Sequence, residues 1–312
     1  MTFTYPGAAI TGWGHALPDK VVTNADFEAR LDTTHEWIVE RTGIHERRHG
    51  GTTSSLAVEA GRAALAKSGN DASEIDLLIL STTTPDQAVP ATSSAVHAEL
   101  GCSGSAFDLN AACAGFVYSL VTAVSMLGVG YKRALVIGAD TLSRITDQED
   151  RATAVLFADG AGAVVIEARP DRELLLSYDL GLDGSLTSIL YCDQGGYIVM
   201  EGREVFRRAV RASVDSAIKV LEAAEVKADH IALFVPHQAN QRIIDAAVQR
   251  LGLASEKSAI VLDRTGNTSS GSMGIALAEA ADEGRLSDGD LVLLSGFGAG
   301  MTWASAVLRW GS

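Results

Sequence analysis

The chain has 312 residues, of which 47% are hydrophobic and 21% are charged, a balance typical of a globular protein with a large core. The formal net charge of −14 argues against nucleic acid or an anionic membrane as the main partner, because both bind basic surfaces. No apolar segment reaches the ~18–20 residues that a membrane span requires, and residues 1–14 lack a basic region followed by an apolar run. We therefore expect neither a membrane-spanning protein nor a secretory signal peptide.

The three cysteines, Cys102, Cys113 and Cys192, have neither the spacing of a metal site nor that of a disulfide framework. An odd number of cysteines suits a reducing compartment. We therefore expect a cytoplasmic protein that binds no metal.

In the first half of the chain, segments typical of strands alternate with segments typical of helices. The expected strands are residues 8–14, 75–81, 106–109, 133–138 and 162–167, and the expected helices begin near residue 24 and span 54–67, 93–100 and 114–127. This alternation predicts an α/β fold, in which a sheet contains parallel strands and carries helices on its faces.

The second half repeats this order after an amphipathic helix at residues 204–221. Its expected strands are residues 231–235, 259–262, 290–294 and 303–308, with a helix at 270–283. Because each corresponds to an element of the first half at similar spacing, we predict two related halves, residues 1–170 and 171–312. Two such halves usually form a site where the loops at the ends of equivalent strands meet.

Cys113 lies where a short strand turns into an apolar helix. The start of a helix offers unpaired N–H groups and the positive end of the helix dipole, which favour the thiolate. The small residues on either side leave room for a substrate carbonyl beside the sulfur. Considered alone, the pattern also fits an inert buried cysteine that packs as a small hydrophobe.

Three loops of the second half offer partners for Cys113. His237 follows the strand at 231–235, Asn267 lies in a turn of small residues, and the loop at 295–300 offers unobstructed backbone N–H groups for an oxyanion. Each has an ordinary structural explanation as a hydrogen-bonding residue, a turn former or a tight turn. Their shared position at the ends of equivalent strands indicates acyl transfer through a thioester.

Five motifs spread over the chain resemble one family. They are EWIVERTGI at residues 36–44, AACAGF at 111–116, FADGAGA at 157–163, PHQAN at 236–240 and GNTS at 266–269. The sequence resembles β-ketoacyl-acyl-carrier-protein synthase III, the initiating condensing enzyme of fatty acid synthesis. The resemblance covers essentially the whole chain and implies the thiolase fold, with two pseudo-two-fold-related βαβαβαββ halves that form an α/β/α/β/α core.

The resemblance implies roles for individual residues. Cys113 would be the nucleophile, His237 and Asn267 would complete the catalytic set, and the backbone N–H groups of Cys113 and Ala299 would form the oxyanion hole. Many members have glycine at the position of Ala299, but alanine keeps the backbone N–H. Arg242 would help to dock an acidic acyl carrier protein, and the family is homodimeric. Coenzyme A or its pantetheine arm would contact Trp37, Arg41, Arg151 and Asn240.

The implied reaction is a decarboxylative Claisen condensation. An acyl-coenzyme A would acylate Cys113, and malonyl-acyl-carrier-protein would then lose carbon dioxide and attack the acyl group. Since decarboxylation generates the carbon nucleophile, neither a metal nor a redox cofactor is expected. The tautomer of His237 cannot be read from the sequence.

The acyl pocket is expected to involve Val89, Met200, Phe206 and Phe297. In the family, the loop that corresponds to Val89 reaches across the dimer and closes the partner's pocket, and some members carry a bulky aromatic residue there. The smaller valine predicts primers that are longer or more branched than acetyl, because each buried methylene contributes ~0.8 kcal/mol.

Other enzymes on the same fold remain as alternatives. A thiolase would carry a second cysteine in the C-terminal glycine loop, and this chain has none there. An acyltransferase or hydrolase would not need both His237 and Asn267. A priming ketosynthase of a polyketide pathway is the main alternative, because it differs chiefly in its carrier protein and primer.

Overall fold

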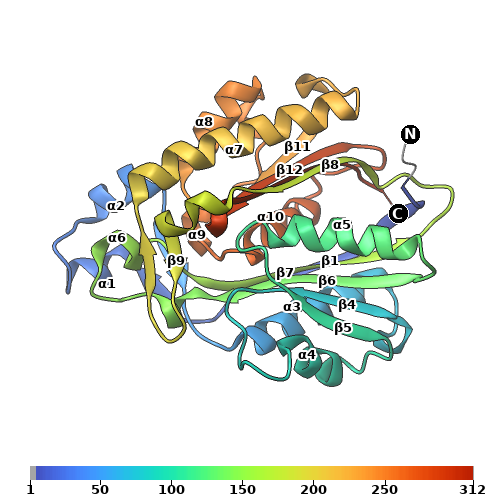
Figure 1. Cartoon of the computed structure of the whole chain (residues 1–312), viewed down its shortest axis with the longest axis horizontal. Coiled ribbons are helices and arrows are strands. Elements are labelled where there is room, and N and C mark those ends of the chain that lie inside the picture. The colour runs from blue at the N-terminus through green and yellow to red at the C-terminus, as the bar shows by residue number, and fades with distance from the viewer. Residues whose placement is uncertain (1–4, 312) are drawn as a thin grey trace.

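The computed structural model describes residues 5–311, and its core is built around two sheets (Figure 1). The first sheet has the strand order β1-β7-β6-β4-β5. Strands β4, β5 and β6 run parallel to one another, whereas β7 is antiparallel to both β1 and β6. The strands are β1 (Ala8–Ala16), β4 (Leu77–Ser81), β5 (Ser105–Leu109), β6 (Arg133–Thr141) and β7 (Asp159–Ala168).

The second sheet has the order β11-β12-β13-β8, with β11 parallel to β12 and the other neighbours antiparallel. Two further antiparallel pairs, β2 with β3 and β9 with β10, lie outside the main sheets. The strands are β8 (Leu175–Leu182), β11 (Ile231–Pro236), β12 (Leu291–Gly298), β13 (Thr302–Arg309), β2 (Val21–Thr23), β3 (Glu46–Arg48), β9 (Leu190–Cys192) and β10 (Ile198–Met200).

Helices fill three layers around the two sheets (Figure 1). The central layer contains α5 (Gly115–Leu127) and α10 (Gly271–Asp282), which share one core with residues of both sheets. Helices α3 (Thr53–Ser68) and α4 (Thr92–Leu100) cover the outer face of the first sheet. Helices α7 (Gly202–Ala223) and α8 (Gln241–Leu251) cover the second. The predicted α/β/α/β/α layering is therefore confirmed.

The remaining helices are short. They are α1 (Asn24–Glu28), α2 (His35–Thr42), α6 (Arg151–Ala154), α9 (Leu262–Thr265) and the 3-10 segments Ala72–Glu74, Leu142–Ile145, Gly184–Ile189, Ala228–His230, Ser255–Lys257 and Ala299–Met301. Among the described residues, no helix is both long and apolar enough to cross a membrane.

The predicted strand at residues 259–262 is wrong. The nearest pairing is an isolated bridge between Phe234 and Ser258, just before the segment, and the chain then turns into α9. The reason is the buried side chain of Gln238, whose Oε1 accepts hydrogen bonds from the backbone N–H groups of Val261 (3.0 Å) and Leu262 (3.2 Å). This side chain therefore satisfies backbone donors that strand pairing would otherwise use.

Helix α10 packs against the first sheet at backbone-to-backbone distance. A Cβ on Gly274 would lie 2.9 Å from the backbone of Gly162 on β7, and a Cβ on Gly138 of β6 would overlap the carbonyl group of Ser270. Only glycine allows an approach this close. The contact fixes the position at which α10 begins, which is where the loop of Asn267 ends.

Candidate active site

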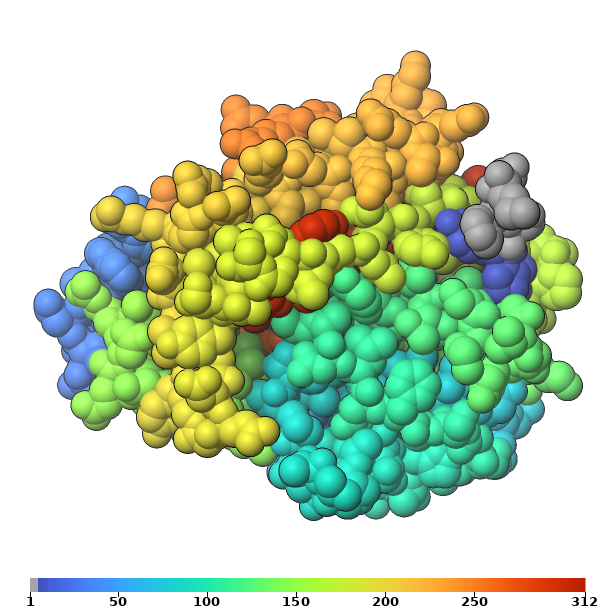
Figure 2. Space-filling view, in the orientation of Figure 1, coloured from blue at the N-terminus to red at the C-terminus, as the bar shows by residue number. Residues whose placement is uncertain are grey.

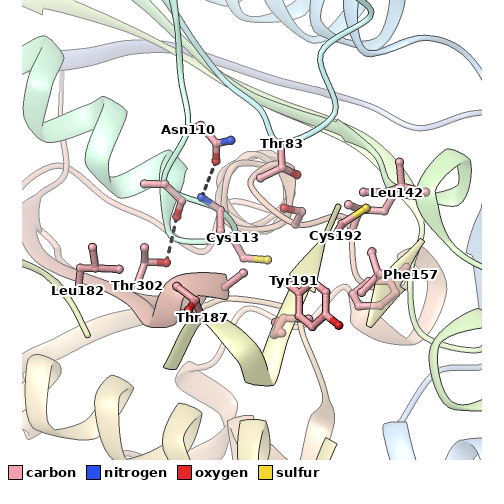
Figure 3. A pocket seen from close by; sticks show the side chains of 18 residues that line it. Thr83, Asn110, Cys113, Leu142, Phe157, Leu182, Thr187, Tyr191, Cys192 and Thr302 are labelled. Atoms are coloured by element: carbon pink, nitrogen blue, oxygen red, sulfur yellow. Dashed lines mark hydrogen bonds between the residues drawn. The ribbon is translucent and has the colours of Figure 1, made fainter. Parts of the chain in front are cut away.

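The turn before α5 holds Cys113 in a constrained conformation. Ala112 has φ +49°, a left-handed value that is uncommon for a residue with a side chain. The turn is closed by hydrogen bonds from Ala112 N to Asn110 Oδ1 (3.1 Å) and from the Thr302 hydroxyl to the Ala111 carbonyl (3.1 Å). Figure 3 shows the resulting orientation, with the sulfur of Cys113 directed into a cavity.

The start of α5 favours the thiolate of Cys113, but burial acts in the opposite direction. Burial raises the pKa of this thiol to about 12, and the nearby negative charge of Asp140 raises it further. The Ser269 hydroxyl and the Cys113 backbone N–H lower the pKa, but by less than burial raises it. A position at the start of a helix therefore does not outweigh the loss of water around the sulfur.

His237 lies directly after β11 and is 3% exposed. Burial lowers the pKa of its imidazole to about 3, so the ring is neutral at physiological pH. Its Nδ1 lies 2.7 Å from the hydroxyl oxygen of Ser272, and its edge faces the ring of Phe297 at a centroid distance of 5.3 Å. These contacts leave Nε2 as the ring nitrogen without a described hydrogen bond.

Asn267 is fixed at both its backbone and its side chain. Its backbone pairs with residues 156–158, at the start of the FADGAGA motif, through Asn267 N to Leu156 O (2.9 Å) and Ala158 N to Asn267 O (2.9 Å). Its side-chain Oδ1 accepts a hydrogen bond from Ser269 N at 2.9 Å. Because a backbone N–H can only donate, the contacting side-chain atom must be the oxygen, and the amide NH₂ group is left free to donate.

The structure brings the three predicted catalytic residues together. Cys113, His237 and Asn267 line one cavity of about 150 Å³, although they come from three separate segments of the chain. The same cavity is lined by Asn240 and by three residues predicted for the acyl pocket, Met200, Phe206 and Phe297.

A larger cavity, of about 510 Å³, opens on another side of Cys113. Figure 2 shows a hollow in this face beside the yellow segment that contains β9 and β10. Ala299 lines this cavity, and Gly298 approaches so closely that a Cβ there would lie 2.5 Å from Cys113 N. Most of the wall was not identified from the sequence, and it includes Leu142, Ile145, Phe157, Leu190, Tyr191, Cys192 and Ile198.

Val89 lines neither cavity of the described chain. It is 84% exposed and lies in the loop between β4 and α4. Within a single chain, Val89 therefore does not contribute to an acyl pocket. Its predicted role depends on a second subunit.

The residues predicted to contact coenzyme A form one cluster built from both halves. The guanidinium groups of Arg41 and Arg151 lie 5.8 and 4.9 Å from the ring centroid of Trp37. Asn240 caps α8 through Arg242 N, and its Nδ2 donates to the Arg41 carbonyl at 3.0 Å. The side chain of Asn240 thus joins α2 to α8. The exposed Arg242 lies with its guanidinium 5.6 Å from the ring of Phe206.

Asp140, at the end of β6, is a buried residue that the sequence did not reveal. Its carboxylate accepts hydrogen bonds from Thr83 N (2.7 Å) and from the backbone N–H and hydroxyl of Ser270 (3.0 and 2.7 Å). It thereby joins the loop after β4 to the turn before α10. Across residues 5–311, no three His, Cys, Asp or Glu side chains are grouped closely enough to hold a metal ion.

A half-buried cysteine at the start of a central helix, faced by a neutral histidine and an amide from the other half, defines a condensing acyltransferase with the thiolase fold. The family described as "3-Oxoacyl-[acyl-carrier-protein (ACP)] synthase III" matches residues 107–184, and its C-terminal part matches residues 221–310. A β-ketoacyl-[acyl-carrier-protein] synthase III of Bradyrhizobium diazoefficiens is 49% identical, with 97% of this chain and 98% of that protein covered. The chain belongs to the β-ketoacyl-[acyl-carrier-protein] synthase III family.

Solved structures agree with this assignment. The crystal structure of 3-oxoacyl-[acyl-carrier-protein] synthase III from Aquifex aeolicus has a TM-score of 0.95 and 44% identity, covering 97% of this chain and all of that chain. The priming β-ketosynthase of the R1128 polyketide pathway has a TM-score of 0.94 and 34% identity, covering all of this chain and 98% of that chain.

Proposed function

We propose that this chain condenses an acyl-coenzyme A primer with malonyl-acyl-carrier-protein to give a 3-oxoacyl-acyl-carrier-protein, the first condensation of fatty acid synthesis. The observation that carries the proposal is the cavity shared by Cys113, His237 and Asn267. It joins a nucleophile to two neutral hydrogen-bond donors, which is what a decarboxylating thioester needs.

In the first half-reaction, the sulfur of Cys113 attacks the thioester carbonyl of the primer. The proton lost by Cys113 leaves with the coenzyme A thiol, and the acyl group remains on the cysteine. The backbone N–H groups of Cys113 and Ala299 hold the oxyanion, supported by the close approach of the Gly298 segment to Cys113. Because the resting thiol has a raised pKa, its deprotonation is coupled to binding and attack.

In the second half-reaction, the malonyl carboxylate leaves as carbon dioxide. The electron pair of the broken bond forms an enolate whose oxygen accepts hydrogen bonds from His237 Nε2 and Asn267 Nδ2. The enolate carbon then attacks the acyl group, and the Cys113 thiolate is released and takes up a proton from water. A neutral His237 is suited to this role, because it donates a hydrogen bond without transferring a proton. We propose that no cofactor takes part.

We assign the primer's acyl chain to the larger cavity, which Met200, Phe206 and Phe297 do not line, and this assignment replaces their predicted place in the acyl pocket. Its volume of about 510 Å³ and its apolar side chains suit a chain of several carbons or a branched chain. The smaller cavity, with Asn240 and Phe206 at its walls, would then take the pantetheine arm that enters past Trp37.

We propose that the protein is a homodimer. Strand β5 is the last strand of the first sheet, with one edge free in the described chain, and the nearby Val89 is exposed. Pairing of two β5 edges would satisfy the free backbone groups and could carry each Val89 to the partner's cavity. Sedimentation velocity at micromolar concentration tests this, and a monomer would contradict it.

Arg242 is proposed to dock the acyl carrier protein. It is exposed beside Phe206, which lines the smaller cavity, so an acidic partner bound there would face the entrance. Arg242→Glu should weaken use of malonyl-acyl-carrier-protein more than acylation by acyl-coenzyme A, and the loss should shrink at high salt. Arg250→Glu, in the last turn of the same helix, is the matched control. Equal losses in both half-reactions at every salt concentration would refute the docking role.

The three cysteines are free, which agrees with our placement of the enzyme in the cytoplasm.

The direct test of the function is intact mass spectrometry after incubation with a panel of acyl-coenzyme A thioesters, followed by addition of malonyl-acyl-carrier-protein. The acyl mass should appear on the wild type, be absent from Cys113→Ala and disappear on condensation. Normal condensation by Cys113→Ala would overturn the proposal.

The half-reactions separate the roles of the two donors. His237→Ala and Asn267→Ala should retain acylation of Cys113 but lose ~10²–10³-fold in decarboxylation, the usual effect of removing one donor to an oxyanion. Poor acylation with normal decarboxylation would reverse the assignment.

A priming ketosynthase of a polyketide pathway is less supported, because that relative is 34% identical against 49% for the fatty acid enzyme of Bradyrhizobium.

A further inference from the structure

Ser272 makes a buried contact with the catalytic histidine that the reaction described above does not use. It lies in the first turn of α10 and is fully buried. Its hydroxyl oxygen is 2.7 Å from Nδ1 of His237 and 3.4 Å from the backbone nitrogen of Gln238. The hydroxyl therefore lies between a backbone N–H and an imidazole nitrogen.

The hydrogen-bond donors and acceptors around this hydroxyl determine where its proton goes. The N–H of Gln238 can only donate, so the Ser272 oxygen is the acceptor in that contact. The hydroxyl has one proton to donate, and its other described partner is His237 Nδ1. The proton of Ser272 is therefore directed at Nδ1, which must accept it through its lone pair.

A neutral imidazole carries its one proton on the other nitrogen when Nδ1 is an acceptor. The opposite tautomer would place two donors, Nδ1–H and the hydroxyl, at one contact, or would turn the hydroxyl away from its only described acceptor. A buried polar hydrogen without an acceptor costs ~1–3 kcal/mol. The hydroxyl of Ser272 thus favours the tautomer with the proton on Nε2.

We propose that Ser272 is a positioning residue that fixes His237 in the Nε2–H tautomer and orients its ring toward the malonyl carbonyl. The proposal rests on the function assigned above, in which Nε2 donates to the enolate oxygen. In the other tautomer, Nε2 would present a lone pair to that oxygen and would repel the developing charge. Ser272 does not touch the substrate and acts through His237.

The same turn and helix position both donors. Asn267 is oriented by the backbone N–H of Ser269, and His237 is oriented by the hydroxyl of Ser272 three residues later. The start of α10 is itself fixed by the glycine contact with β7. A single rigid helix start therefore sets the direction of both N–H groups.

The tautomer can be measured without any reaction. Nitrogen NMR of protein labelled with ¹⁵N-histidine distinguishes the protonated from the unprotonated ring nitrogen, and the signals missing from His237→Gln identify His237. In the wild type we expect a proton on Nε2 near neutral pH. In Ser272→Ala we expect the Nδ1 signal to shift and the tautomers to mix. A wild-type proton on Nδ1 would overturn the proposal, whatever the activity.

Kinetics provide the second measurement. Ser272→Ala should lower malonyl decarboxylation roughly tenfold, as expected for one lost hydrogen bond that orients a donor, and leave acylation of Cys113 unchanged. Ser119→Ala is the matched control, because Ser119 is a buried helical serine on α5 whose hydroxyl has no described partner. Equal effects of the two variants, or equal loss of both half-reactions in Ser272→Ala, would overturn the proposal.

The outcomes also separate this proposal from the proposed function. If the wild type decarboxylates and carries its proton on Nε2, but Ser272→Ala changes neither, then the function stands and the role of Ser272 fails. If the wild type does not decarboxylate malonyl-acyl-carrier-protein, then the function fails, while the NMR result still reports on the contact between Ser272 and His237.

Discussion

Lowering the pH from 7 to 4.5 should destabilise the folded chain through one buried side chain, His237. Its pKa is about 3 in the folded protein because burial disfavours the charged ring, whereas an unfolded histidine has a pKa of about 6.5. Between these two values the unfolded chain binds a proton that the folded chain does not bind. Above pH 6.5 the side chain is neutral in both states, and its titration takes nothing from the unfolding free energy. As the pH falls from 6.5 toward 3, proton binding by the unfolded chain lowers the unfolding free energy progressively.

The size of the effect follows from the two pKa values. Each pH unit between them costs about 1.4 kcal/mol, so the two units from pH 6.5 to 4.5 remove roughly 3 kcal/mol of unfolding free energy. A loss of this size is a large fraction of the stability of an ordinary domain. It should be visible as a shift of the urea midpoint.

The assay compares urea unfolding of the wild type and His237→Gln at pH 7 and 4.5. The wild type and the variant share all other titrating groups. The difference between their losses of unfolding free energy from pH 7 to 4.5 therefore reports on His237 alone. The wild type should lose roughly 3 kcal/mol more than the variant over this interval. His230→Gln, at an exposed position, should behave like the wild type. Equal losses for the wild type and His237→Gln would refute the reasoning.

Three further predictions concern packing, substrate binding and primer choice. Gly162→Ala should lower the thermal midpoint of unfolding by several degrees, because the added Cβ would overlap the backbone of Gly274. Gly184→Ala is the control and should leave the midpoint unchanged, because a Cβ there meets only open space. Equal midpoints for the two variants in differential scanning calorimetry would contradict the prediction. Trp37→Ala should raise KM for acyl-coenzyme A with a smaller change in kcat, and an unchanged KM would contradict a role for Trp37 in binding coenzyme A. Val89→Phe should raise the kcat/KM for acetyl-coenzyme A relative to the kcat/KM for hexanoyl-coenzyme A. An unchanged ratio of these two values, or a wild type that accepts only acetyl-coenzyme A, would refute a role for Val89 in the pocket.

The parts of the fold that depend on local pattern were predictable from the sequence. The apolar run after Cys113 predicts a buried helix, and α5 spans nearly the predicted residues. The alternation of strands and helices predicts sheets with helices on their faces, and the resemblance to the synthase III family implies the layered core that the structure shows. His237 and Asn267 could be selected because they follow elements equivalent to those around Cys113, and the structure brings all three to one cavity.

Features that depend on tertiary contacts could not be predicted in this way. The raised pKa of the Cys113 thiol is set by how completely the surrounding layers exclude water, which no local pattern encodes. The strand predicted at 259–262 is lost to hydrogen bonds from Gln238, a side chain more than 20 residues away. The wall of the larger cavity was missed because it comes from a 3-10 segment and a hairpin without a sequence motif.

The two cavities beside Cys113 are built from different kinds of structure. His237 and Asn267 are held by strands and by a helix packed between two sheets, whereas much of the larger cavity's wall comes from the β9–β10 pair and the segment Leu142–Ile145. Substitutions in that wall can accumulate during divergence without moving the catalytic groups. After gene duplication, such an enzyme can therefore acquire a new primer preference while its bond-forming chemistry is inherited intact.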